Sequence, residues 1–175
     1  NDPTLTRKDV KPAFASLTIG SGSAAIVLCD RRLSRRGNRL LGGSFLAQTA
    51  HHALCAGGVE AARHGDDRPR METDSEALLH AGIEVARQNW PRFLQAVGWS
   101  PTDVTRTLTH QVGKAHRKLL LESLELDPAI DFPTVERFGN TGAVALPMAM
   151  ALGIGQGHLR GGDPGAKQAR AAGGS

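Results

Sequence analysis

The residues best suited to chemistry stand in two short motifs, Thr109-His110-Gln111 and, thirty residues later, Gly139-Asn140-Thr141-Gly142. We expect His110 to follow one apolar strand and Asn140 to follow the next. An imidazole N–H and a carboxamide N–H directed at one substrate oxygen would stabilise an enolate or an oxyanion. The sequence places no serine or cysteine in a convincing nucleophile setting, so these motifs predict one half of an active site.

Each motif also has an ordinary structural explanation. A single histidine beside a glutamine is most often a satisfied core residue, and an asparagine at a strand–helix junction often caps the helix. What favours a shared site is the spacing of the motifs, which lie one crossover helix apart. In a parallel sheet both residues would lie at the carboxyl edge, where open α/β sheets bind their ligands.

The composition is that of one ordinary domain of 175 residues, with 40% hydrophobic and 22% charged residues. A net charge of +4 could favour nucleic acid, but the basic residues are not gathered on one helix and few aromatic residues accompany them. Attraction to an anionic molecule such as coenzyme A explains the charge equally well. Because no run of about 20 apolar residues is present for a membrane span, we expect a cytoplasmic protein without a nucleic-acid partner.

The two cysteines do not form a disulfide framework or a zinc cluster. Cys29 closes an apolar segment and is predicted to be a small buried hydrophobe. His51, His52 and Cys55 have a spacing that could hold a metal ion, but no fourth ligand is evident, so a structural or pocket-lining role is favoured. No motif directs a base at Cys55, which is therefore not expected to act as a nucleophile.

Alternating strands and helices predict an α/β domain with a mostly parallel mixed sheet covered by helices. Strands are expected at 24–28, 40–49, 104–109 and 132–138. The first is continuously apolar and suits a strand buried on both faces. Loops are expected at 30–39 and 56–71. The predicted organisation is a lead-in at 1–15, a domain at 16–157 and an irregular tail at 158–175 that does not contribute to a core.

Three helical regions are predicted between these strands. Thr73 and Glu76 fit a capping box that opens the first helix, and Pro91 is expected to divide this helix before it ends at Gly98. Its apolar stripe is Leu78, Ala81 and Val85. The segment 100–103 carries a proline in the first-turn position and predicts a helix or turn start. The second helix spans 113–126 with Val112, Ala115, Leu119, Leu120 and Leu124 facing inward. The third spans 141–152, where Pro147 kinks it or lies near its first turn.

The two motifs resemble those of a known family. Thr109-His110-Gln111-Val112 and Phe138-Gly139-Asn140-Thr141-Gly142 are similar to the His and Asn motifs of the thiolase-superfamily condensing enzymes, in the β-ketoacyl synthase III branch. Residues 20–28 resemble that branch's glycine turn and core strand. Residues 48–55, with 145–148, are most similar to OleA-type enzymes, which join two acyl-CoA molecules head to head in olefin or β-lactone synthesis. The similarity covers about residues 14–162 and implies the C-terminal half of a thiolase-like fold.

The resemblance also implies roles for individual residues. In this family a cysteine of the N-terminal half takes the first acyl chain as a thioester, and the two motifs bind the thioester oxygen of the second acyl unit. His110 and Asn140 would be the catalytic donors, with His110 neutral at its donating nitrogen. Substrate contacts are expected from Gly139, Thr141, Arg117 and Lys118, the last two near a phosphate at the site entrance. Arg31, Arg32, Arg35 and Arg36 could also meet phosphates or an acidic carrier, although a solvated loop is the commoner explanation.

The implied activity is an acyltransferase that performs a Claisen condensation of acyl thioesters, decarboxylative or not, without a metal or redox cofactor. The implied partners are acyl-CoA or acyl carrier protein and a dimer of full-length chains. Two departures from the family pattern stand out: the half with the nucleophilic cysteine is absent, and the tail after Arg160 does not resemble the family's closing strand. We therefore expect no turnover from this chain alone. The alternative is a non-catalytic partner subunit of an intact synthase, or an inactive remnant. Half of a two-part fold also predicts an exposed apolar face.

Overall fold

The computed structural model describes residues 6, 18–35, 38–58, 70–160 and 168–171. Its α-helices are α3 (Ser75–Val97), α4 (Lys114–Ser123), α5 (Val135–Phe138) and α6 (Ala145–Gly155). Short 3₁₀ turns are η2 (Arg31–Leu33), η3 (Thr49–Leu54), η5 (Pro101–Asp103), η6 (Pro128–Ile130) and η7 (Gly142–Val144). The strands are β1 (Cys55–Gly58), β2 (Arg70–Thr73), β3 (Arg106–Thr109) and β4 (Gln168–Ala171).

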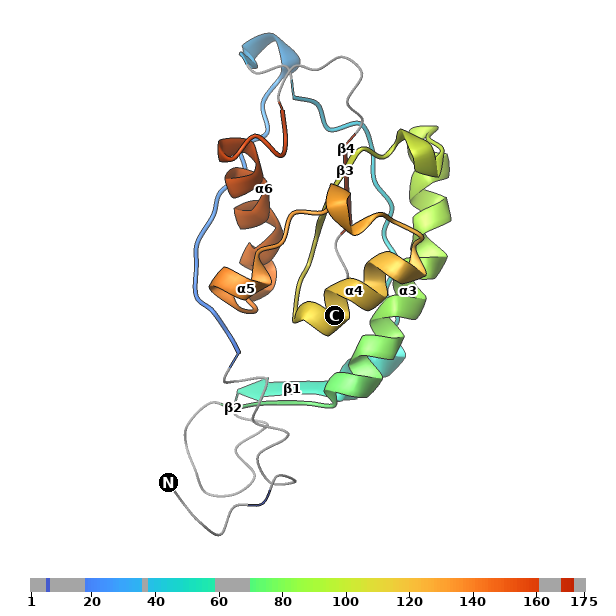
Figure 1. The fold of residues 1–175 in the computed structure, drawn as a ribbon, viewed down its shortest axis with the longest axis vertical. Coiled ribbons are helices and arrows are strands. Elements are labelled where there is room, and N and C mark those ends of the chain that lie inside the picture. The colour runs from blue at the N-terminus through green and yellow to red at the C-terminus, as the bar shows by residue number, and fades with distance from the viewer. Residues whose placement is uncertain (1–5, 7–17, 36–37, 59–69, 161–167, 172–175) are drawn as a thin grey trace.

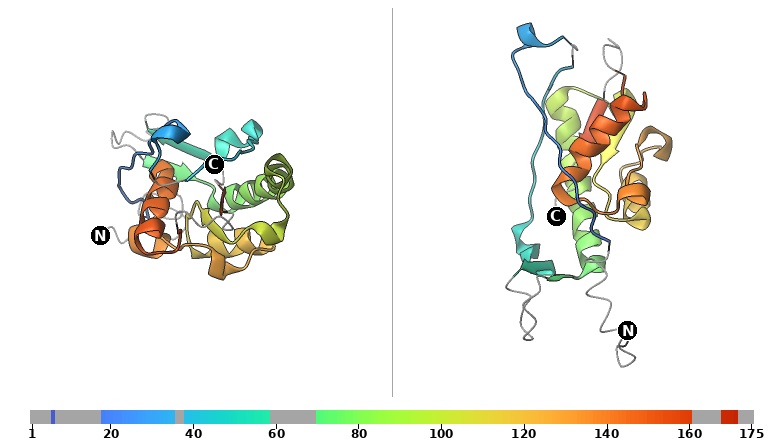
Figure 2. Two further views of the ribbon diagram at one scale, coloured as in Figure 1. Left: turned by 90° about the horizontal axis from the view of Figure 1, so that it is seen from above. Right: turned by 90° about the vertical axis from the view of Figure 1, so that its left-hand side faces the viewer.

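The described strands form two short sheets. β1 and β2 are antiparallel, with Cys55 opposite Thr73, whereas β3 and β4 are parallel, with Arg106 opposite Gln168. Helix α6 lies on one side of the β3–β4 pair and helices α3 and α4 lie on the other (Figures 1 and 2). The α/β class predicted from the sequence is confirmed, although each sheet has only two strands within the described residues.

Helix α3 begins one residue later than a cap at Thr73 would require. The Asp74 carboxylate accepts a hydrogen bond from the Ala77 amide at 3.0 Å, so Asp74 is the N-cap and the predicted Thr73–Glu76 capping box is wrong. Pro91 lies inside the helix without dividing it, and Gly98 ends it in the left-handed conformation at φ +66°. The inward stripe also differs from the predicted one and consists of Leu79, Ile83, Ala86, Trp90 and Leu94.

The apolar core has two main parts on opposite sides of β3. On one side Leu120, Leu121 and Leu124 of α4 and its C-terminal turn pack against Ile83 of α3. Val112 and Ala115 are exposed, so they do not belong to the inward face of α4 as predicted. On the other side Leu108 of β3, which has no exposed surface, packs with Ala149 of α6 and with Leu159. The strand predicted at 104–109 is confirmed as β3.

The two apolar segments near the N-terminus of the described chain are not strands. Residues 24–28 and 40–48 have no regular structure, Val27 is 86% exposed and Phe45 is 98% exposed. Cys29 is exposed too, which corrects the prediction that it is buried. The physical reason is that a strand needs hydrogen-bonded neighbours, and no described segment pairs with either stretch. The exposed apolar surface expected for half of a fold is present in these segments.

Three further predictions need correction. Residues 132–138 do not form a strand: Asp131 makes a single parallel bridge to Thr107, and the chain then turns into helix α5. The predicted loop at 56–71 contains most of β1 and the start of β2, while residues 59–69 lie outside the described part. The tail predicted to be irregular holds strand β4 and the buried Leu159. The lead-in at 1–15 lies outside the described residues except for Thr6.

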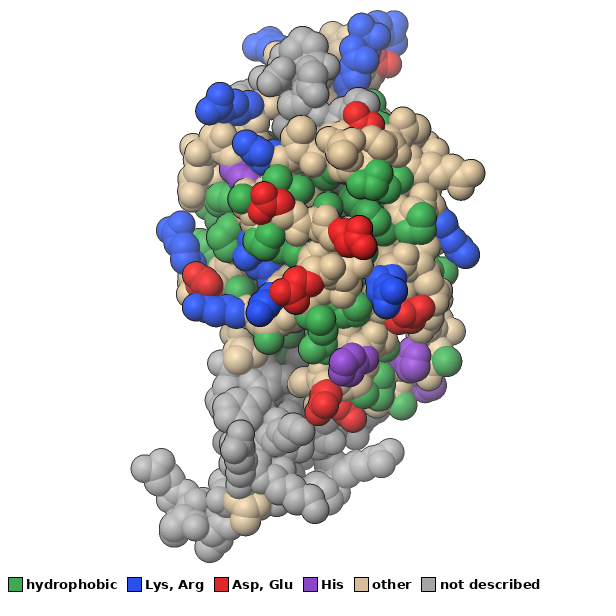
Figure 3. All heavy atoms as spheres, turned by 45° about the vertical axis from the view of Figure 1, so that its right-hand side comes forward, with side chains coloured by type: hydrophobic (Ala, Val, Ile, Leu, Met, Phe, Trp, Pro, Cys, Tyr) green, Lys and Arg blue, Asp and Glu red, His purple; other side chains and the backbone are tan. Residues whose placement is uncertain are grey.

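Other local predictions hold. The segment at 100–103 forms the capped turn η5 with Pro101 in its first turn, and residues 142–155 form η7 and α6 with Pro147 in the first turn of α6. The basic loop carries η2, in which Asp30 caps the turn and pairs with Arg32 at 3.0 Å. Basic side chains gather at the end of the molecule where η2 lies (Figures 1 and 3). No helix among the described residues is long and apolar enough to cross a membrane.

Leu108 should be indispensable to the α6 side of the core. Because its side chain is fully buried, Leu108→Ala removes apolar contacts and leaves a cavity that costs about 2–5 kcal/mol of unfolding free energy. Leu33→Ala, at a position 74% exposed, is the matched control and should change the unfolding free energy by less than about 0.5 kcal/mol. Denaturant titration of the two variants checks this, and equal effects would contradict the assigned core.

Candidate functional site

His110 stands one residue beyond β3, on the side of the strand that faces α6. Along this strand Thr107, Thr109 and Gln111 all direct their side chains at Asp131, whereas Leu108 packs on α6. Since side chains alternate between the two faces of an extended chain, His110 shares the face of Leu108. Its imidazole is half-buried, and burial lowers the pKa of His110 from its usual 6.5. The ring is therefore neutral at pH 7 and retains one N–H donor.

Asn140 is held by its backbone against an extended segment from the start of the described chain. Its amide donates to the Thr18 carbonyl at 2.9 Å and its carbonyl accepts from the Gly20 amide at 2.8 Å, which forms a parallel bridge at Ile19. The side-chain Oδ1 accepts from the Gly142 amide at 3.0 Å. The Asn140 side chain therefore binds the first amide of η7, whose N-cap residue is Thr141. Within the part of the chain that the structure describes, its Nδ2 amino group donates to no protein acceptor.

Gly139 makes this close approach possible. It has φ +69°, and a Cβ at this position would lie 2.6 Å from the Thr18 carbonyl oxygen. A side chain there would clash with the segment that pairs with Asn140. Thr141, on the other side of Asn140, is buried, and its hydroxyl has no partner among the described residues. Gly139 therefore allows the close contact between Asn140 and the Thr18 segment, and Thr141 is buried on the other side of Asn140.

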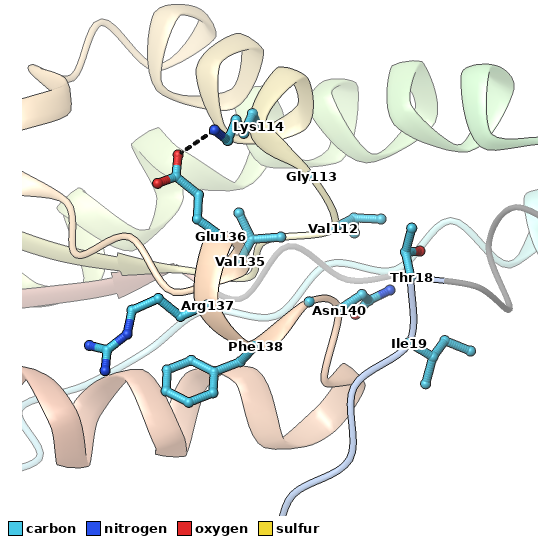
Figure 4. Close-up of a pocket in the computed structure, with 11 residues that line it drawn as sticks. Thr18, Ile19, Val112, Gly113, Lys114, Val135, Glu136, Arg137, Phe138 and Asn140 are labelled. Carbon is cyan, nitrogen blue, oxygen red and sulfur yellow. Dashed lines mark ion pairs between the residues drawn. The ribbon is translucent and has the colours of Figure 1, made fainter.

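A shallow hollow of about 490 Å³ opens beside Asn140. It is bounded by residues 112–114, by residues 135–140, and by Thr18 and Ile19. In Figure 4 the Asn140 side chain points towards Thr18, while Lys114 and Glu136 form an ion pair of 3.2 Å on the opposite side. His110 is not among the lining residues, although Val112 and Gly113, which directly follow its motif, are. The hollow therefore lies between the two motifs.

A buried carboxylate behind β3 was not found by sequence reasoning. Asp131 has a fully buried side chain that accepts hydrogen bonds from Thr107 and Thr109 at 3.2 Å each, and from Arg117 Nε at 2.6 Å. The Arg117 side chain is 21% exposed, and it also donates to the Pro128 carbonyl at 3.0 Å. The alternation of polar residues at 107, 109 and 111 beside the apolar Leu108 was the available signal.

Arg117 and Lys118 do not form the shared phosphate site that the sequence suggested. The Arg117 guanidinium is turned inward to Asp131, so the prediction that it meets a substrate phosphate is corrected: its donors serve a buried ion pair. Lys118 is exposed and lies 3.7 Å from Glu122 on the same helix. His51 and His52 are exposed, and no group of three or more metal-ligating side chains is found among the described residues.

Gln111, in the His110 motif, contacts the start of helix α5, which leads into the Asn140 motif. Its Oε1 accepts hydrogen bonds from the amides of Thr134 and Val135 at 2.9 and 3.1 Å, where helix α5 begins. Its Nε2 donates to the Phe132 carbonyl at 2.8 Å and lies 3.4 Å from the Asp131 carboxylate. Because α5 ends at Phe138, directly before Gly139 and Asn140, this amide helps to hold the His-bearing segment against the Asn-bearing segment.

Comparison with known proteins gives this architecture a family. Residues 94–175 match the family described as 3-oxoacyl-[acyl-carrier-protein] synthase III, C terminal. A variant of Xanthomonas campestris OleA, crystallised with bound lauric acid and lauroyl-CoA, aligns with a TM-score of 0.80 at 28% identity, covering 91% of this chain and 44% of that chain. Residues 94–175 are thus a domain of this C-terminal family, and the chain has the thiolase-like fold of the C-terminal half of OleA.

Two of the individual relatives carry different names. The chain is 39% identical over 165 residues to an acyl-CoA:acyl-CoA alkyltransferase of Shewanella oneidensis, covering 93% of this chain and 47% of that protein. It is 29% identical over 155 residues to a β-ketoacyl-[acyl-carrier-protein] synthase III of Streptomyces coelicolor, covering 85% and 46% respectively. The chain thus spans about half the length of these relatives. The family match runs through the tail to residue 175, so the departure inferred after Arg160 is corrected.

Removing the Arg117 partner of the buried Asp131 carboxylate should lower the unfolding free energy strongly. Arg117→Met keeps the aliphatic stem but leaves a buried carboxylate without its cation, which costs about 3–5 kcal/mol. Lys118→Met is the matched control, because it removes the neighbouring charge from an exposed pair and should cost less than about 1 kcal/mol. Denaturant unfolding measures both, and a small loss in Arg117→Met would contradict the assigned pair.

The partly buried histidines His110 and His116 should make the protein less stable in mild acid. The pKa of His116 is lowered by burial and, secondarily, by the charge that His110 would carry. Below about pH 6.5 the unfolded chain therefore binds more protons at these residues than the folded chain, and the unfolding free energy falls as the pH falls. Its pH slope, measured between about pH 7 and pH 5, should become shallower in His116→Gln but not in the exposed control His80→Gln. An unchanged slope in His116→Gln would refute this assignment.

Proposed function

We propose that this chain is the C-terminal part of an acyltransferase that joins two acyl thioesters by Claisen condensation. Its similarity to proteins named acyl-CoA:acyl-CoA alkyltransferase supports the proposal. His110 and Asn140 bind the thioester oxygen of the second acyl unit. The observation that supports this proposal most is that each motif holds an N–H donor, the neutral imidazole of His110 and the Nδ2 group of Asn140, and that the hollow lined by Asn140 is also bounded by Val112 and Gly113, which follow the His110 motif.

The proposed chemistry uses these donors when charge develops. The α-carbon of the second acyl unit loses its proton to a base that is assigned to the remainder of a full-length enzyme, or loses its carboxyl group as carbon dioxide in a decarboxylative reaction. In either case negative charge moves to the thioester oxygen. Two N–H donors in a partly buried site stabilise that charge more than they stabilise the neutral ground state. The new carbon–carbon bond then forms at the carbonyl of the first acyl chain, whose carbon–sulfur bond breaks. The cysteine that carries this first chain is assigned to the remainder of a full-length enzyme.

The substrate and assembly follow from the same relationship. Long-chain acyl-CoA is the proposed substrate, with acyl carrier protein as the alternative carrier. Lys114, which lines the hollow, and Lys118, further along α4, provide exposed positive charge. Gly139 and Thr141 shape the wall beside Asn140. No metal or redox cofactor takes part in the proposed reaction. A dimer of full-length chains in the cytoplasm, serving fatty acid or olefin biosynthesis, completes the proposal.

A second candidate is a non-catalytic subunit that packs on an intact synthase. The exposed apolar side chains of Val27, Leu28 and Phe45 favour it, because surfaces of this kind are usually covered by another polypeptide. The two candidates differ in what happens when the missing half is supplied. A catalytic half regains activity that depends on His110, whereas a packing subunit does not.

The deciding experiment is a chimera in which this chain replaces the matched part of the Shewanella relative. We expect the chimera to release free thiol from long-chain acyl-CoA, while His110→Ala and Asn140→Ala each lower turnover by about 10²- to 10³-fold. Arg87→Ala, on the exposed side of α3, is the control and should retain turnover. Undiminished thiol release in His110→Ala would refute the assigned role. Steady condensation by the 175-residue chain alone would show that the nucleophile has been misplaced.

A further inference from the structure

We infer that Gln111 is the positioning residue of this site, setting the geometry between His110 and Asn140; this inference rests on the proposed function. The buried amide of Gln111 lies between the segment that carries His110 and the start of helix α5, and it contacts both. It follows His110 directly in the sequence, and it bonds the two amides that begin helix α5, which ends directly before Gly139-Asn140. Gln111 therefore links the segment that carries His110 to the helix that leads into Asn140, in addition to the Thr107–Asp131 bridge and the Lys114–Glu136 ion pair.

The geometry of Gln111 requires an amide and no other group. Its oxygen accepts from Thr134 and Val135 while its nitrogen donates to the Phe132 carbonyl, so the side chain must be both acceptor and donor. A carboxylate keeps the acceptor but loses the donor, and a methionine of similar size loses both. The residue is 1% exposed, so water has little access to replace a lost partner.

The buried ion pair of Asp131 and Arg117 sets the orientation of the Gln111 side chain. Asp131 Oδ2 lies 3.4 Å from the Gln111 Nε2 and 2.6 Å from Arg117 Nε. Thr107 and Thr109 hold the same carboxylate from β3. The nitrogen of Gln111 thus faces a fixed negative charge, which determines which end of the amide points to α5. This arrangement fixes the rotamer of Gln111 before any substrate is bound.

A misplaced donor should lower kcat more than it changes KM. The two donors gain most of their value when charge develops on the substrate oxygen, so misplacing one of them raises the barrier more than it weakens substrate binding. A shift of about 1 Å in a catalytic group can cost about a hundredfold in rate. A residue that served only as a cap for α5 would instead lower the melting temperature and leave kcat near the parent value.

The test compares variants of the chimera described above. Gln111→Met should lower kcat by about a hundredfold with KM nearly unchanged. Leu94→Ala, a core residue of α3 in the separate cluster with Val104, is the control for general destabilisation. Both are assayed at the same interval below their own melting temperatures. A loss of kcat in Gln111→Met no larger than in Leu94→Ala would overturn the inference.

A conservative variant adds a pH signature. In Gln111→Glu the new carboxyl faces the buried Asp131 carboxylate, which raises the pKa of the new group. As the pH falls the new carboxyl becomes protonated and regains a donor, so the kcat of Gln111→Glu relative to the parent should rise. The same ratio for Gln111→Met should stay flat. A flat ratio for both variants would contradict the positioning role.

A readout that does not need activity separates this inference from the proposed function. With isotope-labelled protein, Gln111→Met should shift the NMR signals of the His110 ring and of the Gly139 and Asn140 amides, whereas Leu94→Ala should leave them in place. Unmoved signals would overturn the inference even in an active chimera. If the parent chimera is inactive while these signals move, the proposed function fails and the positioning inference stands.

Discussion

The buried carboxylate of Asp131 is the constraint on which the rest of the site depends. A fully buried charge is costly unless it is paired and hydrogen-bonded. Here the donors come from β3, from Gln111 just beyond it and from Arg117 on α4. These segments satisfy the carboxylate together, so their relative placement is tied to it. A buried pair of this kind is weak evidence for stability, and its main effect here is to fix the arrangement.

In this arrangement the two faces of β3 make different contacts. The face with Thr107, Thr109 and Gln111 is polar and fixed to Asp131, while Leu108 on the opposite face packs on α6. His110 lies on the apolar face, where burial keeps its imidazole neutral. The polar network therefore leaves His110 on the apolar side, where it has no oppositely charged partner among the residues that the structure describes.

Sequence patterns identified the parts that local interactions determine. The strand at 104–109, the capped turn with Pro101 and the helix with Pro147 in its first turn depend on neighbouring residues, and the structure contains all three. Residues 24–28 and 40–49 have apolar patterns, but a strand exists only with paired neighbours, which no local pattern supplies. The segment 132–138 has a strand-like pattern too. It becomes helical where the distant Gln111 caps its first amides.

The site was predictable to a similar extent. The motifs around His110 and Asn140 were recognisable because their residue types and their family resemblance agree, and the convergence of the two donors remains a prediction. The inward turn of Arg117 was not visible, because it depends on Asp131, fourteen residues away and itself placed by β3. The family relationship confirms the fold, while the chain spans about half the length of its relatives.

The pairing of β3 with β4 has a consequence for how the polypeptide matures. The two strands run parallel, although about sixty residues separate them along the chain. During synthesis on the ribosome, β3 and its polar network emerge long before β4. One ladder edge of β3 therefore stays unpaired until β4 has been translated. Contacts of such long sequence separation slow folding, so the nascent chain passes through a period in which this edge is open to chaperones or to wrong strands.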